Sequence, residues 1–279
     1  MPRGGGGPDR GATHPWQMLM WTAFTFACSV AVVFTLAHYA LATRAGQERD
    51  QAAMEAVYAR AAVREQVLSM LGYVSIGTTA LALIVCVGLA LVRKRYAAAV
   101  GAITVVAAAN VTTQLLKDKA FVRPDYGNLT INSLPSGHTT VVASVTLAAL
   151  LIAPMAARAF VSILGTFAVT LTGASTIVAG WHRPSDVFAG LAVSLAWGSL
   201  VVFVLGIRRP GRLPRAQWWP TFWSVVGAIG AGALLVLIGV RPMQGWQGLI
   251  DAALVLGSIG VVSAAVVGVF ARLSSVHAR

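Results

Sequence analysis

Two short segments carry the side chains best suited to nucleophilic or acid–base chemistry. Residues 135–138 read PSGH and residues 180–186 read GWHRPSD, and each segment precedes an apolar run. His182 and Asp186 are four residues apart, so on a helix that extended back to His182 they would share a face. The carboxylate would then hold one imidazole nitrogen and leave the other as a usable nucleophile. His138 supplies a second imidazole, and we expect both histidines to gather at the same end of the helices that follow them.

Both segments also have the residue types of helix starts. Ser136 can cap a helix, and Gly137 lets an anion approach the backbone closely. The free N–H groups and the helix dipole then favour an anion of phosphate size, although an ordinary N-cap before a membrane helix is the alternative interpretation. In the second segment, Pro184 suits the first helical position, with Ser185 or Asp186 in the first turn.

Cations and amides lie just before the PSGH segment. Lys117, Lys119 and Arg123 fall between two apolar runs. A guanidinium can grip phosphate oxygens with two N–H groups, whereas an ammonium acts as a point charge. Asn110, Gln114 and Lys117 are spaced four and three residues apart, so one helix face points polar groups toward the same end. For Asn110 and Gln114, simple helix association is the alternative.

The composition indicates that membrane helices position these residues. The 279 residues are 57% hydrophobic and 11% charged, with a mean hydropathy of +0.75. Globular chains average roughly 45–50% apolar residues, so we expect much of this apolar surface to face lipid. The net charge of +12 comes mainly from basic residues between apolar runs. Anionic headgroups explain that charge better than nucleic acid. Cys28 and Cys86 lie in apolar runs and predict neither a disulfide framework nor a metal motif.

Eight apolar runs predict an all-α, polytopic bundle, because about 20 apolar residues cross the hydrocarbon core. The runs are 18–43, 67–92, 97–116, 139–155, 160–180, 187–207, 221–240 and 249–270. A cleaved signal peptide is the alternative for 18–43, but its apolar run is too long. Between and around the runs we expect a disordered cytoplasmic tail (1–17), an amphipathic or solvated surface helix (44–66), a basic cytoplasmic loop (208–220) and a second tail (272–279).

The distribution of basic residues predicts the orientation. With the N-terminus in the cytoplasm, the cytoplasmic segments carry more than half of the Lys and Arg residues. This agrees with the positive-inside rule. The loops 117–135 and 180–186 then open on the extracytoplasmic side of the plasma membrane.

Three blocks of this sequence, in this order, resemble the type 2 phosphatidic acid phosphatase superfamily, whose relatives include soluble vanadium haloperoxidases. The family pattern is K-x6-R-P, then P-S-G-H, then S-R-x5-H-x3-D. The second block matches in full at 135–138, and the third matches at Ser175, His182 and Asp186. The resemblance implies a six-helix phosphatase core over 18–207, to which two further helices over 221–271 are added.

The chain departs from the family pattern at two places. Arg123 and Pro124 are intact, but Lys117 is one residue closer to Arg123 than the pattern requires, with Lys119 as the fallback. Thr176 stands where the family has an arginine. Phosphate binding therefore loses one expected cation, and Arg183 is the proposed substitute.

The resemblance also implies roles for these residues. His182 would attack phosphorus to give a phosphohistidine, Asp186 would orient it, and His138 would act as general acid and then base. The phosphoryl oxygens would be held by Lys117, Arg123, Ser136, Gly137 and Arg183. Neither a metal nor another cofactor is implied, and the sequence has no acidic cluster to hold magnesium.

The expected activity is hydrolysis of a lipid phosphate or diphosphate of the phosphatidic acid, phosphatidylglycerol phosphate or polyprenyl phosphate class. The expected partners are this substrate and membrane lipids, with no nucleic acid, and the sequence does not indicate an oligomeric state. One alternative is a phosphotransferase with a glycan or lipid acceptor. Another is a transporter or structural membrane protein in which Thr176 marks a decayed site. A haloperoxidase is disfavoured, because the relatives with that chemistry are soluble.

Overall fold

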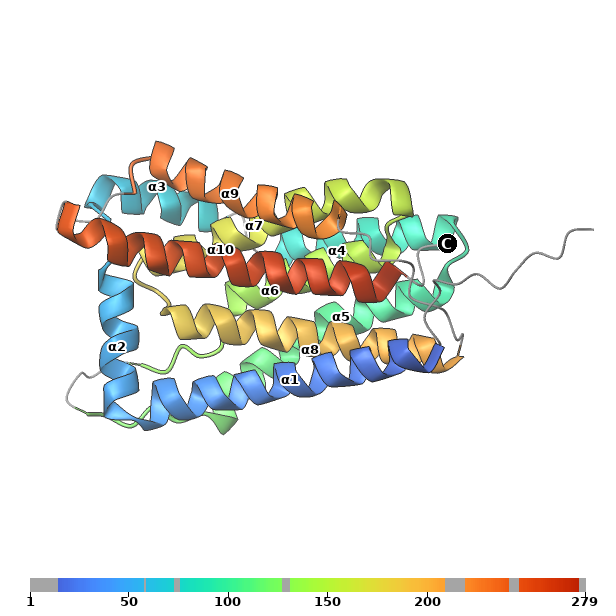
Figure 1. The fold of residues 1–279 in the computed structure, drawn as a ribbon, viewed down its shortest axis with the longest axis horizontal. Helices are drawn as coiled ribbons and strands as arrows, with labels where there is room; N and C mark the ends of the chain where they lie inside the picture. The colour runs from blue at the N-terminus through green and yellow to red at the C-terminus, as the bar shows by residue number, and fades with distance from the viewer. Residues whose placement is uncertain are drawn as a thin grey trace, which may run out of the picture.

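The computed structural model describes residues 15–57, 59–72, 76–126, 131–208, 219–240 and 246–275, which form an all-α bundle without a strand (Figure 1). Its elements are α1 (Pro15–Ala42), α2 (Arg44–Glu55), α3 (Ala61–Gly72), α4 (Ile76–Val92), α5 (Tyr96–Leu115), the π-helical turn η1 (Leu116–Ala120), α6 (Gly137–Ile152), the 3-10 turn η2 (Met155–Ala157), α7 (Arg158–Val178), α8 (Pro184–Arg208), α9 (Trp219–Leu237) and α10 (Trp246–Ser274). The predicted fold class is confirmed.

Six helices of the described chain are long and apolar enough to cross a membrane. They comprise Trp16–Ala42, Tyr96–Ala120, Met155–Val178, Pro184–Arg208, Trp219–Leu237 and Gly248–Ser274. The other two predicted spans correspond to shorter apolar helices, α4 and α6. The 16 residues of α6 extend for about 24 Å, less than the ~30 Å hydrocarbon core.

The region 44–66 differs from the single surface helix that the sequence predicts. Thr43 accepts a hydrogen bond from the backbone N of Gly46 at 3.0 Å, so α2 starts directly after α1. The helix ends at Glu55 because the chain then turns inward, where Val57 and Ala59 are buried in the main hydrophobic cluster. α3 follows as a separate helix that packs against α7.

The predicted span 67–92 is consequently too long at its start. Residues 67–72 belong to α3, where Val67 and Leu71 are buried, and the membrane helix begins only at Ile76. Several predicted boundaries fall outside the described residues: most of the 1–17 tail (1–14), most of the 208–220 loop (209–218) and the last residues of the 272–279 tail (276–279). Of those segments, Pro15–Gln17 is already helical and α10 continues to Ser274.

Helix α8 is the central element that positions the site. It packs against α1, α5, α6 and α10, and most of its residues are buried. A Cβ atom added at Gly190 would lie 2.8 Å from the backbone O of Ser136, so α8 approaches the start of α6 closely. At the other end of the bundle, Arg158 of α7 is fully buried and bonds to Leu150 of α6 and to Ser274 and the backbone of α10.

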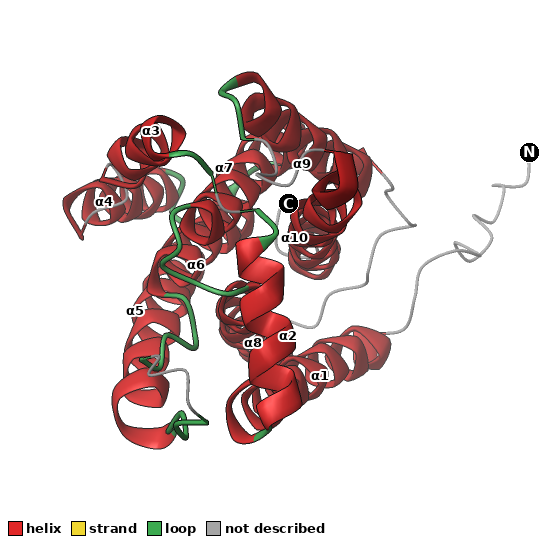
Figure 2. Cartoon of the chain, turned by 90° about the vertical axis from the view of Figure 1, so that its left-hand side faces the viewer, coloured by secondary structure: helices red, strands yellow, loops and turns green. Residues whose placement is uncertain are grey.

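One end of the bundle collects the loops that carry the sequence motifs. Helices α1, α5 and α7 end there, and α6 and α8 begin there (left side of Figure 1). Helix α2 lies across this end, roughly perpendicular to the long helices, and passes in front of α8 when the bundle is viewed end-on (Figure 2). The N-terminal start of α1 and the end of α10 lie at the opposite end.

Candidate active site

His182 and Asp186 are in contact at the start of α8. His182 Nδ1 lies 3.2 Å from Asp186 Oδ2, and the two residues are 7% and 0% exposed. The helix does not extend back to His182, contrary to the expectation from spacing, since it begins at Pro184. Instead Asp186, in the first turn, accepts the backbone N–H of Arg183 at 2.9 Å, the reciprocal bond of a capping box. Nδ1 is thereby tied to the carboxylate, which leaves Nε2 for chemistry.

The second imidazole lies beside the first. The ring centroids of His138 and His182 are 6.4 Å apart, with an angle of 67° between the planes. Ser136 caps α6, because its hydroxyl accepts a hydrogen bond from the backbone N of Thr139 at 3.4 Å. The backbone N of Ser136 in turn donates to the carbonyl of Asp186 at 2.8 Å, so the two motif loops are joined directly. Both histidines therefore lie at the same end of the bundle.

The surroundings of the PSGH segment differ from residue to residue. Ser136 is fully buried, and its hydroxyl also accepts a 3.0 Å hydrogen bond from Thr139 Oγ1. Gly137 is only half-buried, and an added Cβ would meet just the amide of Gln114, at 3.5 Å. Trp181 packs against His138 with a centroid distance of 5.6 Å while 47% of it stays exposed. The backbone at Gly137 and the half-buried His138 thus line the accessible part of the site, whereas His182 is buried.

Three cations interact with the residues of the site. Lys117, half-buried on η1, interacts electrostatically with both Asp186 and His138, whereas Lys119 is exposed. The spacing left the choice between these lysines open, and the geometry favours Lys117. Burial lowers the pKa of Arg123, and the neighbouring positive charge of Arg183 lowers it further. Two guanidinium groups held this close repel each other, and an anion between them relieves that repulsion.

Ser175 and Thr176, at the end of α7, occupy the positions where the family has its serine and its arginine, respectively. The Thr176 side chain is fully buried and donates to the carbonyl of Gly173 at 2.7 Å. Its own carbonyl accepts the backbone N–H groups of Trp181 and His182 at 3.0 and 3.2 Å. Thr176 therefore shapes the loop that presents His182. The Ser175 hydroxyl is buried and has no hydrogen-bond partner among the described residues.

Asn110 and Gln114, the polar residues that precede Lys117, make different contacts. Asn110 bonds to Ser144 Oγ at 3.2 Å and to a carbonyl of its own helix, so it joins α5 to α6. This is the helix-association role that the sequence left open. Gln114 is exposed, and its amide lies next to Gly137 at the mouth of the site.

Three residues of the site carry no motif signal and were not predicted. Ser133 donates to Asp186 Oδ2 at 2.6 Å and accepts from Arg183 Nη1 at 3.3 Å. Gln51 of α2 accepts from Arg183 Nε at 3.0 Å. Asp50, also on α2, accepts hydrogen bonds from the backbone N, at 3.1 Å, and the hydroxyl of Ser185. All three hold the segment 183–186.

Asp50 is an unusual carboxyl group for a residue on a polar helix. Burial raises the pKa of Asp50 from 3.8 to about 6, and the hydrogen bonds from Ser185 offset part of that effect. The negative charge of Asp186 raises it further and the positive charge of Arg183 opposes this. Among the described residues, no three His, Cys, Asp or Glu side chains gather in a position to hold a metal ion.

The fold and site together define a class of protein: a multi-pass membrane protein with paired imidazoles and a cation-lined cup at one end of its helices. Residues 98–210 match the family model of the PAP2 superfamily, a segment that runs from α5 through α8. This match supports the assignment to the type 2 phosphatidic acid phosphatase superfamily that the motifs predict. Searches of curated proteins and of solved structures returned no significant match.

The superfamily match implies phosphatase or phosphotransferase chemistry on phosphate esters. Members of this superfamily are generally phosphatases, which supports a phosphoric ester hydrolase at that level of description. The six long apolar helices and the family agree on a multi-pass membrane protein.

Proposed function

We propose that the protein hydrolyses a lipid phosphate or diphosphate through a phosphohistidine on His182. The observation that carries this proposal is the pair of imidazoles, 6.4 Å apart between centroids, one of which is bound to Asp186. Reacting atoms in a bound substrate lie roughly 3–3.5 Å apart, so one phosphoryl group fits between two rings at this separation.

In the first step, His182 Nε2 forms a bond to phosphorus while the bond from phosphorus to the leaving oxygen breaks. His138 donates a proton to that oxygen, so the lipid leaves as an alcohol, or as a monophosphate if the substrate is a diphosphate. In the second step, His138 accepts a proton from water, whose oxygen attacks phosphorus. The N–P bond then breaks, free phosphate leaves, and both histidines return to their starting states.

The cations stabilise the charge that spreads over the phosphoryl oxygens. Lys117 and Arg123 approach the phosphoryl group from the η1 side, and Arg183 approaches it from the start of α8. The backbone N–H groups near Gly137 and the capped helix start at Ser136 complete the phosphate-binding site. In this arrangement Arg183 supplies the cation that the family pattern has at Thr176. Asp186 keeps the positively charged, phosphorylated imidazole of His182 stable.

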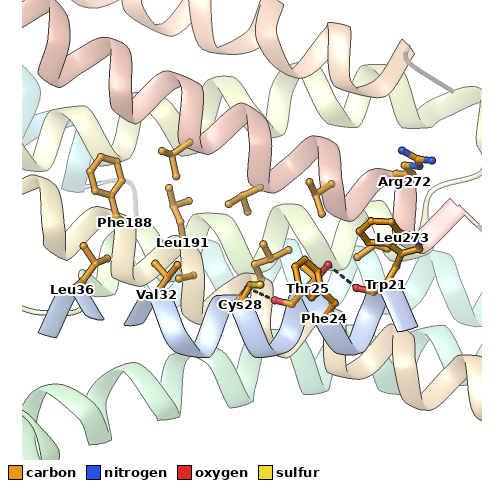
Figure 3. Close-up of a pocket in the computed structure, with 16 residues that line it drawn as sticks. Trp21, Phe24, Thr25, Cys28, Val32, Leu36, Phe188, Leu191, Arg272 and Leu273 are labelled. Carbon is orange, nitrogen blue, oxygen red and sulfur yellow. Dashed lines mark hydrogen bonds between the residues drawn. The ribbon is translucent and has the colours of Figure 1, made fainter. Parts of the chain in front are cut away.

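A cleft along the membrane helices supports a substrate with an apolar tail. It has a volume of about 650 Å³ and lies between α1, α8 and α10 (Figure 3). Its walls are apolar except for a few side chains, and on α1 they extend from Trp21 to Leu36, a rise of about 22 Å. At the end nearest the site, Phe188 of α8 lines the cleft two residues after Asp186. The tail would lie there, with its phosphate at the start of α8.

The distribution of basic residues supports an extracytoplasmic site at the plasma membrane. Counted over the whole sequence, 12 of the 21 Lys and Arg residues fall in the segments that are cytoplasmic when the N-terminus is inside. Such an excess is typical of the cytoplasmic side. The motif loops would then open on the outer surface, where a lipid headgroup of the outer leaflet can reach them.

The test is phosphate release by purified protein in detergent with EDTA, across a panel of lipid phosphates and the soluble ester p-nitrophenyl phosphate. We expect turnover of both classes, a lower KM for the lipids, and complete loss in His182→Ala. An absolute requirement for an added divalent metal would refute the mechanism. Phosphate release that depends on a glycan or lipid acceptor would favour a phosphotransferase, and a lack of turnover with the whole panel would favour a decayed site.

A second variant tests the lipid part of the proposal alone. Val32→Trp places a large ring in the cleft from α1, whereas Val111→Trp places the same ring on the exposed surface of α5. We expect Val32→Trp to raise KM for long-chain lipid phosphates without changing KM for p-nitrophenyl phosphate. Equal kinetics of the two variants on lipid would leave the cleft without a role in substrate binding.

A further inference from the structure

Helix α2 presents one polar face to the site. Gln47, Asp50 and Gln51 are spaced three and four residues apart, so their side chains leave the helix on the same side. The buried amide of Gln47 donates to the carbonyls of Leu41, at 2.8 Å, and Pro124, at 3.0 Å. Figure 2 shows that α2 passes in front of α8 at this end of the bundle, and the hydrogen bonds of Asp50 and Gln51 reach the start of α8. The opposite side carries exposed residues such as Glu48, which pairs with Arg44.

The contacts of this face reach both loops that carry the proposed phosphate-binding cations. Pro124 directly follows Arg123, and Gln51 contacts Arg183 itself. Asp50 bonds to Ser185 in the first turn of α8, where a carboxylate also interacts favourably with the helix dipole. Helix α2 is outside the segment 98–210 that matches the family. The face of α2 therefore adds contacts to the site that the matched segment does not contain.

The amide of Gln51 has a defined orientation. Its Nε2 donates to Glu55 Oε1 at 2.9 Å, which directs the amide oxygen toward Arg183 Nε, 3.0 Å away. Arg183 also donates from Nη1 to Ser133. A guanidinium has five N–H donors, so three remain within the described contacts for a phosphoryl group. The two bonds hold the planar group in one orientation although its chain has several rotatable bonds.

The acceptor at position 51 is a neutral amide, and this affects the charge that Arg183 can offer to a substrate. A carboxylate at position 51 would bind Nε more strongly but would also neutralise the positive charge of Arg183. An amide holds the guanidinium and leaves that charge for the substrate. We propose that Gln51 is a positioning residue for Arg183, and that α2 thereby completes the phosphate site from outside the family segment. This inference rests on the proposed function, because it takes Arg183 as a phosphate-binding group.

The test compares removal of the acceptor with its conversion to an acid. Gln51→Ala removes the bond to Arg183. The double variant Gln51→Glu with Glu55→Gln exchanges the amide and the carboxylate, so the link between positions 51 and 55 is kept. Glu55→Gln alone and Glu48→Gln, on the exposed side, are the controls. The readout is the inhibition constant of inorganic phosphate against p-nitrophenyl phosphate hydrolysis, together with the midpoint of thermal unfolding.

We expect Gln51→Ala to weaken phosphate binding about three- to tenfold, the value of one hydrogen bond. The exchanged pair should weaken it more than Gln51→Ala does, while its thermal midpoint stays equal to that of the natural chain or rises. A merely structural role for Gln51 predicts the reverse, since the stronger bond of the acid would restore binding. Phosphate binding in the exchanged pair as tight as in the natural chain would overturn the inference.

One further variant separates this inference from the proposed function. In an Arg183→Ala background, Gln51→Ala should cause no additional loss of phosphate binding, because its effect acts through the guanidinium. If Arg183→Ala itself leaves phosphate binding unchanged, the assignment of Arg183 in the proposed function is wrong. If Arg183→Ala weakens binding and the Gln51 variants do not, only the role of Gln51 is wrong.

Discussion

Replacing Asp186 by Asn tests the centre of the proposed mechanism with almost no change in shape. Asp186 Oδ2 accepts three hydrogen bonds, from His182 Nδ1, Ser133 Oγ and the backbone N of Arg183. Its Oδ1 is buried without a hydrogen-bond partner among the described residues. Asn should place its oxygen at the Oδ2 position, because the opposite orientation would bring its NH₂ group against the N–H of Arg183. His182 then keeps its tautomer, and the substitution removes mainly the negative charge.

The distance sets the size of the effect. The negative charge of the carboxylate and the positive charge of a phosphorylated imidazole are separated by 3.2 Å if the positive charge is placed on Nδ1. Their separation is about 4 Å if the positive charge is placed within the ring. At an effective dielectric constant of about 20, their attraction is about 4–5 kcal/mol. Each 1.36 kcal/mol corresponds to about a tenfold change in rate, so kcat should fall by a factor between about 10³ and 10⁴.

The assay is phosphate release by the purified variant in detergent, with circular dichroism and thermal unfolding to check the fold. Asp251→Asn is the matched control, since Asp251 is exposed near the start of α10, at the same end of the bundle. We expect the control to keep the kcat of the natural chain. A loss of less than tenfold in a folded Asp186→Asn protein would show that the carboxylate does not stabilise a charged His182, and the phosphohistidine step would have to be abandoned.

Four further outcomes are expected. His138→Ala should slow the release of the alcohol from an alkyl phosphate in a single turnover by about 10²–10⁴ and the release of p-nitrophenol from p-nitrophenyl phosphate much less, because only the alkoxide needs a proton on leaving; equal losses in this first step would rule out His138 as the acid. Burial raises the pKa of Asp50 from 3.8 to about 6, so the folded state favours the protonated carboxyl and the free energy of unfolding falls as pH rises between these values. Asp50→Asn should remove this fall, and identical pH profiles of thermal unfolding for the two proteins would contradict it. Gly190→Ala should destabilise the protein by about 1–3 kcal/mol and lower its activity, since the added Cβ would lie 2.8 Å from the carbonyl before α6. Gly257→Ala, where a Cβ meets nothing within 4 Å, should do neither in parallel melts and rate assays. Arg158→Met should lower the thermal midpoint by removing buried hydrogen bonds from a charged group at the far end of the bundle, yet leave the specific activity of the folded protein unchanged.

Much of the bundle follows from the sequence because a membrane leaves the backbone few choices. In hydrocarbon every N–H and C=O must bond within its own segment, so a long apolar run becomes a helix and its length is readable from composition. The predicted runs 97–116 and 187–207 therefore correspond closely to α5 and α8. The proximity of the two motif loops also follows from the order of the helices. The loop 117–135 follows α5 and the loop 180–186 follows α7, and these two helices cross the membrane in the same direction, so both loops emerge on the same side.

The parts outside the membrane were harder to predict because their composition permits several placements. The segment 44–66 mixes charges with apolar residues, which suits a helix on any surface. Its break depends on Val57 and Ala59 finding space in the core, and that space is created by α7 and its neighbours. Ser133 gave no signal because a serine before a proline-containing loop is common in any connection. Its partners, Asp186 and Arg183, are about 50 residues away in the sequence.

The start of α8 shows how a correct contact can follow from a wrong premise. The spacing of His182 and Asp186 suggested a shared helix face, but Pro184 begins the helix and His182 precedes it. The contact forms because the carboxylate turns back to cap the N–H of Arg183, which brings His182 Nδ1 to the same oxygen. One carboxylate oxygen therefore fixes the nucleophile and the neighbouring cation together.

That coupling bears on the missing arginine at Thr176. A cation on α7 would need its own support at the end of that helix, where the Thr176 side chain is instead fully buried against its own backbone. A cation at position 183 is supported by groups that the nucleophile already requires, Asp186 and Ser133, and needs only one more acceptor for Nε. Gln51 supplies that acceptor. The phosphate site then depends on a helix far upstream of the family segment, and loss of α2 should weaken phosphate binding even when His138 and His182 keep their places.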